Sequence, residues 1–233
     1  MKTTLTTIQP GYAALSLSRD GAECCAGAAA AVLAELRHMF VHLPPDRAGV
    51  RIAGLTTLRP LLACDGAIGR VAAAALGPRC QAVRAILFDK TAAMNWSLDW
   101  HQDRTISVVE RRDVDGYGPW TMKRGMLHVA PPFDLLAGMV TLRVHLDDVP
   151  DTNAPLLIAP GSHRLGRLRS GEIGAVVRKC GTISCIARAG DIWLYGTPIV
   201  HASEAAALPA RRRVLQVDYA ARDLPGGLQW LGV

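Results

Sequence analysis

The chain has 233 residues, half of them hydrophobic and a fifth charged, and its formal net charge is +6. This balance is typical of a folded globular protein and argues against extended disorder. No apolar run reaches the roughly 18 residues that a membrane-spanning helix needs. The basic residues are scattered rather than gathered into an aromatic-interleaved patch, so we do not expect nucleic-acid binding.

The N-terminus, Met1-Lys2-Thr3-Thr4, lacks the apolar segment and cleavage site of a signal peptide, so we expect a cytoplasmic protein that does not engage a membrane. The six cysteines form no CxxC pair, and we interpret them as buried thiols. His38 and His42 lie four residues apart on a predicted helix and would share one face. No third ligand lies nearby, so we interpret both as surface or interface histidines.

Two alanine-rich segments at the start of the chain are predicted to be helices. The first runs from residue 22 to about residue 43, with large apolar residues at helical spacing, and ends at Pro44-Pro45. The second runs from about residue 55 to 76, is interrupted at Pro60 and is closed by Gly77-Pro78. We expect these helices to cover one side of the core, and their apolar faces could support a homodimer.

From about residue 80 the pattern changes to short strands separated by glycine and proline turns. Strands are predicted at 82–90, within 95–111, and at 139–147, 156–159, 182–187, 191–195 and 214–219. Residues 139–147 alternate apolar and polar side chains, which is typical of a half-buried strand. The order favours a mainly β fold, with a jelly-roll or barrel core and N-terminal helices packed on one side.

No linker or internal repeat divides the chain. We therefore predict a single domain over residues 1–233, with a helical part over about 1–80 and a jelly-roll core over about 81–222.

The stretch Trp100-His101-Gln102-Asp103 carries the most informative polar residues. Side chains alternate along an extended strand, so His101 and Asp103 project to the same face. His201, which precedes a run of three arginines at 211–213, could supply a second imidazole. Two histidines and one carboxylate on one face of a metal leave open positions, as in non-haem Fe(II) oxygenases. The alternative is a polar pair on an exposed strand and a structural histidine.

The motifs around these residues, taken in order, resemble the phytanoyl-CoA dioxygenase family of Fe(II)/2-oxoglutarate-dependent oxygenases, which have a double-stranded β-helix core. The matching segments are Asn95-Trp96, Trp100-His101-Gln102-Asp103, Leu146-Asp147-Asp148, Pro160-Gly161-Ser162-His163, Gly190-Asp191, His201-Ala202-Ser203 and Arg212-Arg213-Val214-Leu215. They extend over about residues 82 to 220. The resemblance implies that His101, Asp103 and His201 bind Fe(II).

The resemblance also implies a cosubstrate site. Arg212, eleven residues after His201, matches the arginine that pairs with the distal carboxylate of 2-oxoglutarate, a role suited to a planar guanidinium. The match within the three-arginine run is uncertain by one residue, although Arg211 and Arg213 should point the opposite way on a strand. Further candidates for this site are Ser203, Trp120, Lys90 and Asn95.

Several histidines and an arginine outside this set are harder to assign. His145 and Arg143 lie on the polar face of their predicted strand and either line the pocket or face solvent. His163 lies in a loop that the family does not use for metal binding, so we interpret it as structural. His128 has no assigned role.

By this resemblance the protein is an oxidoreductase that uses O2 and 2-oxoglutarate and releases succinate and CO2. The expected outcome is hydroxylation of an unactivated C–H bond in a small or medium metabolite, natural-product-like or amino-acid-like, because the short chain lacks large substrate-covering insertions. Asp103 favours oxygenation, since halogenating relatives carry a small residue there. Desaturation, cyclisation and epimerisation stay open. A jelly-roll metalloenzyme that does not use 2-oxoglutarate, or a non-catalytic binding module, would also be compatible with these residues.

Overall fold

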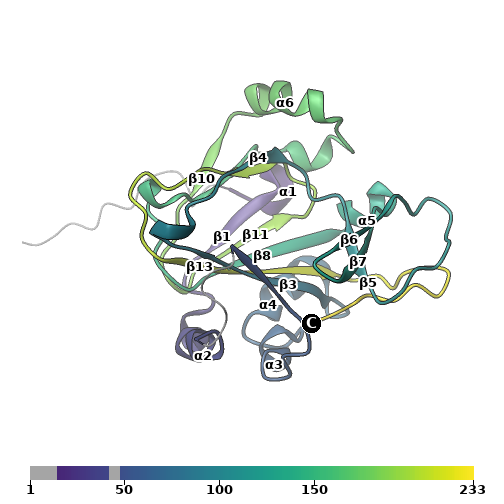
Figure 1. Ribbon diagram of the computed structural model, residues 1–233, viewed down its shortest axis with the longest axis horizontal. Helices are drawn as coiled ribbons and strands as arrows, with labels where there is room; N and C mark the ends of the chain where they lie inside the picture. Colours follow the sequence, from purple (N-terminus) through teal and green to yellow (C-terminus); the bar gives the residue numbers. More distant parts are fainter. Residues whose placement is uncertain (1–14, 42–47) are drawn as a thin grey trace, which may run out of the picture.

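The computed structural model describes residues 15–41 and 48–233, which form three antiparallel sheets with helices on the outside (Figure 1). The largest sheet has the order β1 (Ala22–Cys25), β11 (Ile192–Gly196), β8 (Met139–His145), β13 (Arg212–Ala220), β3 (Gln81–Lys90) and β2 (Gly49–Ile52). The second has the order β10 (Ile183–Cys185), β9 (Leu156–Ile158), β12 (His201–Ser203) and β4 (Leu98–His101). The third contains β5 (Ile106–Val108), β7 (Met126–Val129) and β6 (Trp120–Lys123).

The first two sheets pack face to face. Trp193 and Tyr195 of β11 are fully buried against Leu156 and Ile158 of β9, in one apolar cluster between the sheets. Strand side chains alternate, so each of these strands sends every second residue into this space. The result is the predicted jelly-roll core of two opposed antiparallel sheets.

The prediction that residues 139–147 form a half-buried strand is wrong, because every residue of β8 is buried. Leu142 and Val144 pack on one face with the N-terminal helices. Thr141, Arg143 and His145 are buried on the other face. The alternation is real, but the polar face points into the interior between the sheets rather than to water.

The N-terminal region differs from its prediction. Residues 22–25 form β1, which pairs with β11 and buries Ala22 completely, so the helix predicted from residue 22 to 43 is wrong in its first part and correct over residues 33–39. A short η2 (Ala30–Val32) and α2 (Leu33–Met39) follow. Pairing with a sheet edge outweighed the helical preference of alanine. His42 and Pro44-Pro45 lie outside the described residues, and His38 is exposed.

The second predicted helix consists of two, α3 (Arg59–Leu62) and α4 (Gly69–Leu76), joined by a turn. Pro60 occupies the first turn of α3, where proline is tolerated. A side chain at Gly69 would meet the backbone oxygen of Ala63, so the two helices need glycine at this close contact. In Figure 1, α2, α3 and α4 lie on the same side of the large sheet, and apolar residues of all three join its core cluster.

The remaining helical segments lie in connections between strands. They are α1 (Leu17–Asp20), η3 (Ala92–Met94), α5 (Phe133–Ala137), η4 (Asp151–Asn153), η5 (Ser162–Arg164), η6 (Ser170–Glu172) and α6 (Ile173–Cys180). Within residues 15–41 and 48–233, none of the helices has the length and apolar character to cross a bilayer. All six cysteines are free thiols, but only Cys80 and Cys185 are buried; the other four are partly exposed.

Candidate active site

Sheet register brings two histidines together. His101 ends β4, His201 begins β12, and the two are directly opposite in the antiparallel pair. Their ring centroids lie 4.3 Å apart. The Nδ1 atom of His101 is 2.7 Å from the carbonyl oxygen of Asp99, and that of His201 is 3.0 Å from the carbonyl oxygen of Ile199. A carbonyl only accepts, so each Nδ1 carries the proton and each Nε2 keeps a free lone pair.

Asp103 joins this pair two residues after His101. One potential ligand atom from each of Asp103, His101 and His201 lies within 4.8 Å of the other two, a spacing that suits one metal ion. Gln102 points away between them. Its amide donates to the carbonyls of Pro198 and Gly166 and accepts from the backbone N–H of Leu168. These bonds connect the segment carrying two of the three side chains to the loop before His201.

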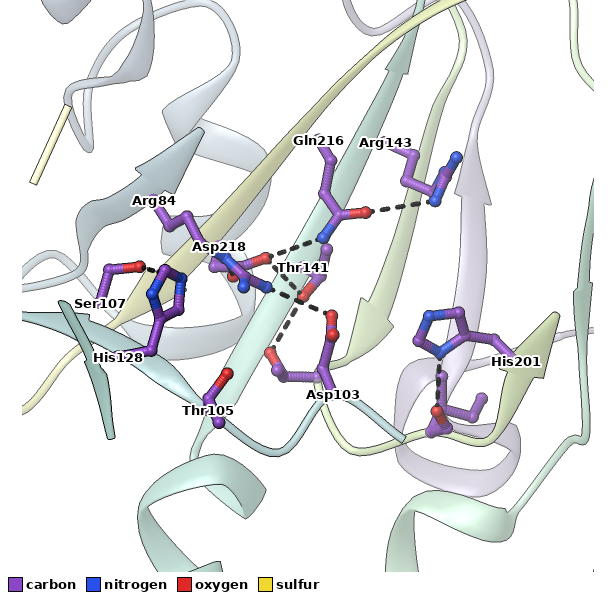
Figure 2. Close-up of polar contacts among 12 residues, drawn as sticks. Arg84, Asp103, Thr105, Ser107, His128, Thr141, Arg143, His201, Gln216 and Asp218 are labelled. Carbon is purple, nitrogen blue, oxygen red and sulfur yellow. Dashed lines mark hydrogen bonds and ion pairs between the residues drawn. The ribbon is translucent and has the colours of Figure 1, made fainter. Parts of the chain in front are cut away.

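Arg84 supports the carboxylate of the triad (Figure 2). Its Nη2 lies 3.3 Å from Asp103 and its Nε lies 2.5 Å from Asp218. Thr141 donates to the other oxygen of Asp218 at 3.0 Å. Burial opposes ionisation of Asp103, but Arg84 and then the two histidines outweigh it and lower the pKa of this carboxyl below its usual value. Asp103 is therefore ionised at neutral pH.

His201 is ready to bind a metal in its neutral form. Burial, followed by the neighbouring His101, lowers the pKa of His201 to about 4. A neutral imidazole keeps the lone pair that a cation needs. Two imidazoles and one carboxylate on one side of a metal match the facial arrangement preferred by non-haem Fe(II).

A cavity of about 440 Å³ opens onto the triad. Its apolar lining includes Ile86, Phe88, Trp96, Leu98 and Leu156. Its basic lining consists of Arg51, Arg84, Lys123, Arg124 and Arg143. The only carboxylate that lines the cavity, within the described part of the chain, is Asp103.

Two further cations, Lys90 and Arg212, form a group with Arg143; Arg143 lines the cavity and the other two do not. Lys90 Nζ donates to the Ser203 hydroxyl at 3.1 Å and to the Glu204 carbonyl at 2.7 Å. Burial, and then Arg212 and Arg143, lower the pKa of Lys90 to about 7. No ion pair joins these three cations to a carboxylate within residues 15–41 and 48–233. A buried charge without an opposite charge beside it is costly, so this group of cations is suited to an anionic ligand.

Arg212 stands apart from the arginines beside it. Its side chain is 1% exposed and donates to the Ala154 carbonyl, while Nε and Nη2 have no partner. Burial, and then Arg143, lower its pKa to about 9. Arg211 pairs instead with Asp89 at 2.9 Å, and Arg213 with Asp147 at 2.7 Å. Of the three, Arg212 alone has buried guanidinium nitrogens without a partner in the described chain.

Two predicted cosubstrate residues, Trp120 and Asn95, do not line the cavity. Trp120 packs in a separate apolar cluster, with the Arg111 guanidinium 5.6 Å from its ring, and does not line the cavity. The Asn95 amide accepts from the backbone N–H of Ala206 and donates to its carbonyl, which secures the segment after β12. Ser203, in contrast, lines the cavity, as does Arg143.

The other unassigned histidines are buried or partly buried. His145 is 1% exposed, and both of its ring nitrogens lack partners. Burial, and then Arg143 and Arg212, hold the pKa of His145 well below its usual value. His128 bonds to the Ser107 hydroxyl at 3.0 Å (Figure 2). His163 packs close to Gly21, where an added Cβ would meet its ring.

Sequence reasoning missed Arg84, Asp218 and three cavity cations, Arg51, Lys123 and Arg124. A signal existed for the first two, because Arg84 and Asp218 each place a charge between apolar residues of a predicted strand. Such a charge must find a partner when the strand is buried. The positions of the other three depend on an edge strand and a hairpin that the sequence did not reveal.

The family model described as Phytanoyl-CoA dioxygenase (PhyH) matches residues 61–214, more than half of the chain. No curated protein sequence matches significantly.

Similar solved structures share the fold. The apoform of EctD from S. alaskensis is 16% identical with a TM-score of 0.63, covering 93% of this chain and 78% of that one. HygX from Streptomyces hygroscopicus, solved with nickel, 2-oxoglutarate and hygromycin B, is 16% identical with a TM-score of 0.59, covering 88% and 84%. SnoN, a non-haem α-ketoglutarate-dependent epimerase from nogalamycin biosynthesis, is 21% identical with a TM-score of 0.55, covering 91% and 87%.

Proposed function

Because the chain belongs to the phytanoyl-CoA dioxygenase family, we propose that it is an Fe(II)- and 2-oxoglutarate-dependent oxygenase with its metal on His101, Asp103 and His201. The convergence of these three side chains within 4.8 Å is the observation that carries the proposal. Two imidazoles and one ionised carboxylate would hold Fe(II) and leave the remaining coordination positions open. HygX was solved with iron bound, and EctD with bound Fe, which supports the metal assignment.

The cationic group beside the triad supports a dianionic cosubstrate. Arg212 would receive the distal carboxylate of 2-oxoglutarate on its free nitrogens, with the Ser203 hydroxyl and Lys90 beside it. Arg143, which lines the cavity and whose Nε lacks a partner, would add a fourth donor. HygX with nickel and 2-oxoglutarate, and EctD with 2-oxoglutarate and 5-hydroxyectoine, are relatives of the same fold that bind this cosubstrate.

When bound, iron would couple oxidative decarboxylation of 2-oxoglutarate, to succinate and CO2, with oxidation of a substrate by O2. The chain supplies position and charge: Arg84 holds Asp103 in its ionised form, and Gln102 secures the segment that carries the ligands. The proposed outcome is hydroxylation of a C–H bond in a small or medium metabolite, which the cavity of about 440 Å³ can hold. A homodimer stays a prediction.

The test is succinate formation by purified protein supplied with Fe(II), 2-oxoglutarate and O2. We expect slow succinate release without substrate, and its loss in Asp103→Ala and in His201→Ala, because each variant loses a metal ligand. The controls are His38→Ala and Asp223→Ala, which change exposed residues of the same types outside the cavity. Full turnover by both ligand variants would contradict the proposal. Metal binding without any 2-oxoglutarate effect on thermal stability would favour a different metalloenzyme.

A further inference from the structure

Three basic side chains of the cavity have no role in the site described above. Arg51 lies on β2, Lys123 ends β6, and Arg124 begins the turn between β6 and β7. None of them forms an ion pair within residues 15–41 and 48–233. The Nε of Arg51 is buried without a partner, and burial followed by Arg84 and Arg124 lowers the pKa of Arg51. The cavity therefore concentrates like charges that repel each other.

The turn that carries Arg124 is strained. Arg124 has φ 50° and the next residue, Gly125, has φ 77°. The first position of such a hairpin turn favours asparagine, aspartate or glycine, and a larger side chain there costs on the order of 1 kcal/mol. The Arg124 guanidinium reaches across to the Gly49 carbonyl at 2.6 Å. A strained arginine at the rim of a cavity indicates a use for its charge.

The surplus charge persists when the proposed cofactors are present. Fe(II) and dianionic 2-oxoglutarate sum to zero, and Arg84 with its two carboxylates, Asp103 and Asp218, leaves one negative charge. Against it stand four further positive charges in the cavity lining, those of Arg51, Lys123, Arg124 and Arg143. The hydrogen-bond partners of Lys123 and Arg124 are neutral, namely the Thr105 hydroxyl at 3.4 Å and the Gly49 carbonyl. Cations that stay unneutralised in a concave site attract an anion and strengthen its binding.

The same cavity has apolar walls. Phe88 and Trp96 lie with ring centroids 5.9 Å apart, and Ile86 and Leu98 also line the space. We propose, on the basis of the proposed function, that the primary substrate carries a carboxylate or phosphate group held by Arg51, Lys123 and Arg124. An apolar body would lie along the aromatic wall, with the C–H bond to be oxidised near the triad. The site then selects anionic substrates over neutral and cationic ones.

The experiment uses the full chain loaded with Ni(II) and 2-oxoglutarate and titrates it calorimetrically with four probes of matched shape. These are 3-phenylpropanoate, 2-phenylethylphosphonate, 3-phenylpropanamide and 3-phenylpropylammonium. We expect at least one anion to bind about tenfold more tightly than the amide, the difference between a charge-assisted and a neutral hydrogen bond. The ratio of the two anions tells which group the site prefers.

Variants locate the source of the preference. Arg51→Gln/Arg124→Gln should abolish it, whereas Arg51→Lys/Arg124→Lys should keep part of it because the charges stay. Arg79→Gln/Lys179→Gln removes two exposed cations outside the cavity and should change nothing. Melting curves check that each variant is folded. If the double variant at Arg51 and Arg124 does not fold, Lys123→Gln replaces it, because it changes an exposed side chain, and it should weaken the preference.

Two outcomes overturn the inference. If 2-oxoglutarate binds normally but the amide or ammonium probe binds as tightly as both anions, or neither anion binds, the inference fails alone. If 2-oxoglutarate does not bind to the Ni(II)-loaded protein, the proposed function fails and the inference fails with it.

Discussion

Two charged pairs on the same two strands, β3 and β13, contrast sharply. Arg84 lies directly opposite Asp218, and six residues further along β3 Lys90 lies directly opposite Arg212. Burial lowers the pKa of Arg84, but Asp218 and Asp103 outweigh it and raise the pKa above its usual value. The pKa of Lys90 and that of Arg212 are both lowered. Like charges opposite each other in a ladder are destabilising.

The two pairs show two uses of a buried cation. Arg84 is neutralised within the protein, so its work is to hold Asp103 and Asp218 in place. Arg212 and Lys90 are not neutralised by any carboxylate of the described chain, so a bound anion would offset the cost of burying their charges. In the β3–β13 ladder, the Arg84–Asp218 pair is neutralised within the protein, whereas the Lys90–Arg212 pair is not.

The largest effect is expected on stability, when the Arg84–Asp218 pair is removed. Arg84→Gln leaves Asp103 and Asp218 in a buried site without a cation, so the free energy of unfolding of the metal-free protein should fall by about 3–5 kcal/mol. Urea denaturation followed by circular dichroism measures the loss. The double variant Arg84→Gln/Asp218→Asn should recover part of it, because one stranded charge is removed. An unchanged unfolding midpoint for Arg84→Gln would contradict the assignment.

The second effect is expected on 2-oxoglutarate binding, when the Lys90–Arg212 pair is changed. Arg212→Gln should weaken 2-oxoglutarate binding to the Ni(II)-loaded protein by about a hundredfold, near 3 kcal/mol, because a buried charge partner is lost. In the absence of 2-oxoglutarate the variant should be no less stable than the original chain, since it relieves repulsion from Arg143 and Lys90. Calorimetric titration and thermal melts test both points. Arg211→Gln, which removes a half-exposed charge, is the matched control. If Arg211→Gln weakened 2-oxoglutarate binding as much as Arg212→Gln, the special role of Arg212 would be contradicted.

A third effect concerns pH. The pKa of Lys90 is about 7 in the ligand-free protein, against an ordinary value of 10.5, so at pH 8 the amine is largely neutral. A bound carboxylate favours the charged amine and raises this pKa. Binding of 2-oxoglutarate should therefore take up a proton above pH 7, and its affinity should fall by up to about tenfold per pH unit towards pH 10.

Titration at pH 8 in two buffers of different ionisation enthalpy measures this uptake directly. Lys90→Met should abolish it while leaving the fold intact, because the methionine chain fills the same space. Uptake of the same size in Lys90→Met would assign the proton to another group.

The smallest effect concerns a neutral side chain that is satisfied within the protein. Asn95→Ala removes two hydrogen bonds to Ala206, so the free energy of unfolding should fall by about 1–3 kcal/mol. The 2-oxoglutarate affinity of the folded variant should not change, because the Asn95 amide bonds to the Ala206 backbone and does not line the cavity. A large loss of affinity without loss of stability would instead support a direct role.

The strands that the sequence predicted best are those with strong local patterns. Residues 82–90 and 214–219 appear as β3 and β13 nearly as expected. The convergence of His101, Asp103 and His201 was also predictable, because their motifs follow the family order. β2, the β6–β7 hairpin and α6 were not predicted, since their short segments carry weak periodicity. Alternation along a strand predicted that Arg212 points to the opposite side from Arg211 and Arg213. The ion pairs of Arg211 and Arg213 with Asp89 and Asp147 agree with this prediction.

Three features can be read from the sequence alone. They are the β core, the motif of two histidines and one carboxylate, and Arg212 at eleven residues after His201, the spacing typical of the family. These features depend on local alternation and on the order of motifs, which a linear chain displays. Only the tertiary structure decided that Arg84 meets Asp218 across 134 positions and that Lys90 faces Arg212. Register between strands far apart in sequence determines which charges become partners, and therefore which cations remain for a ligand.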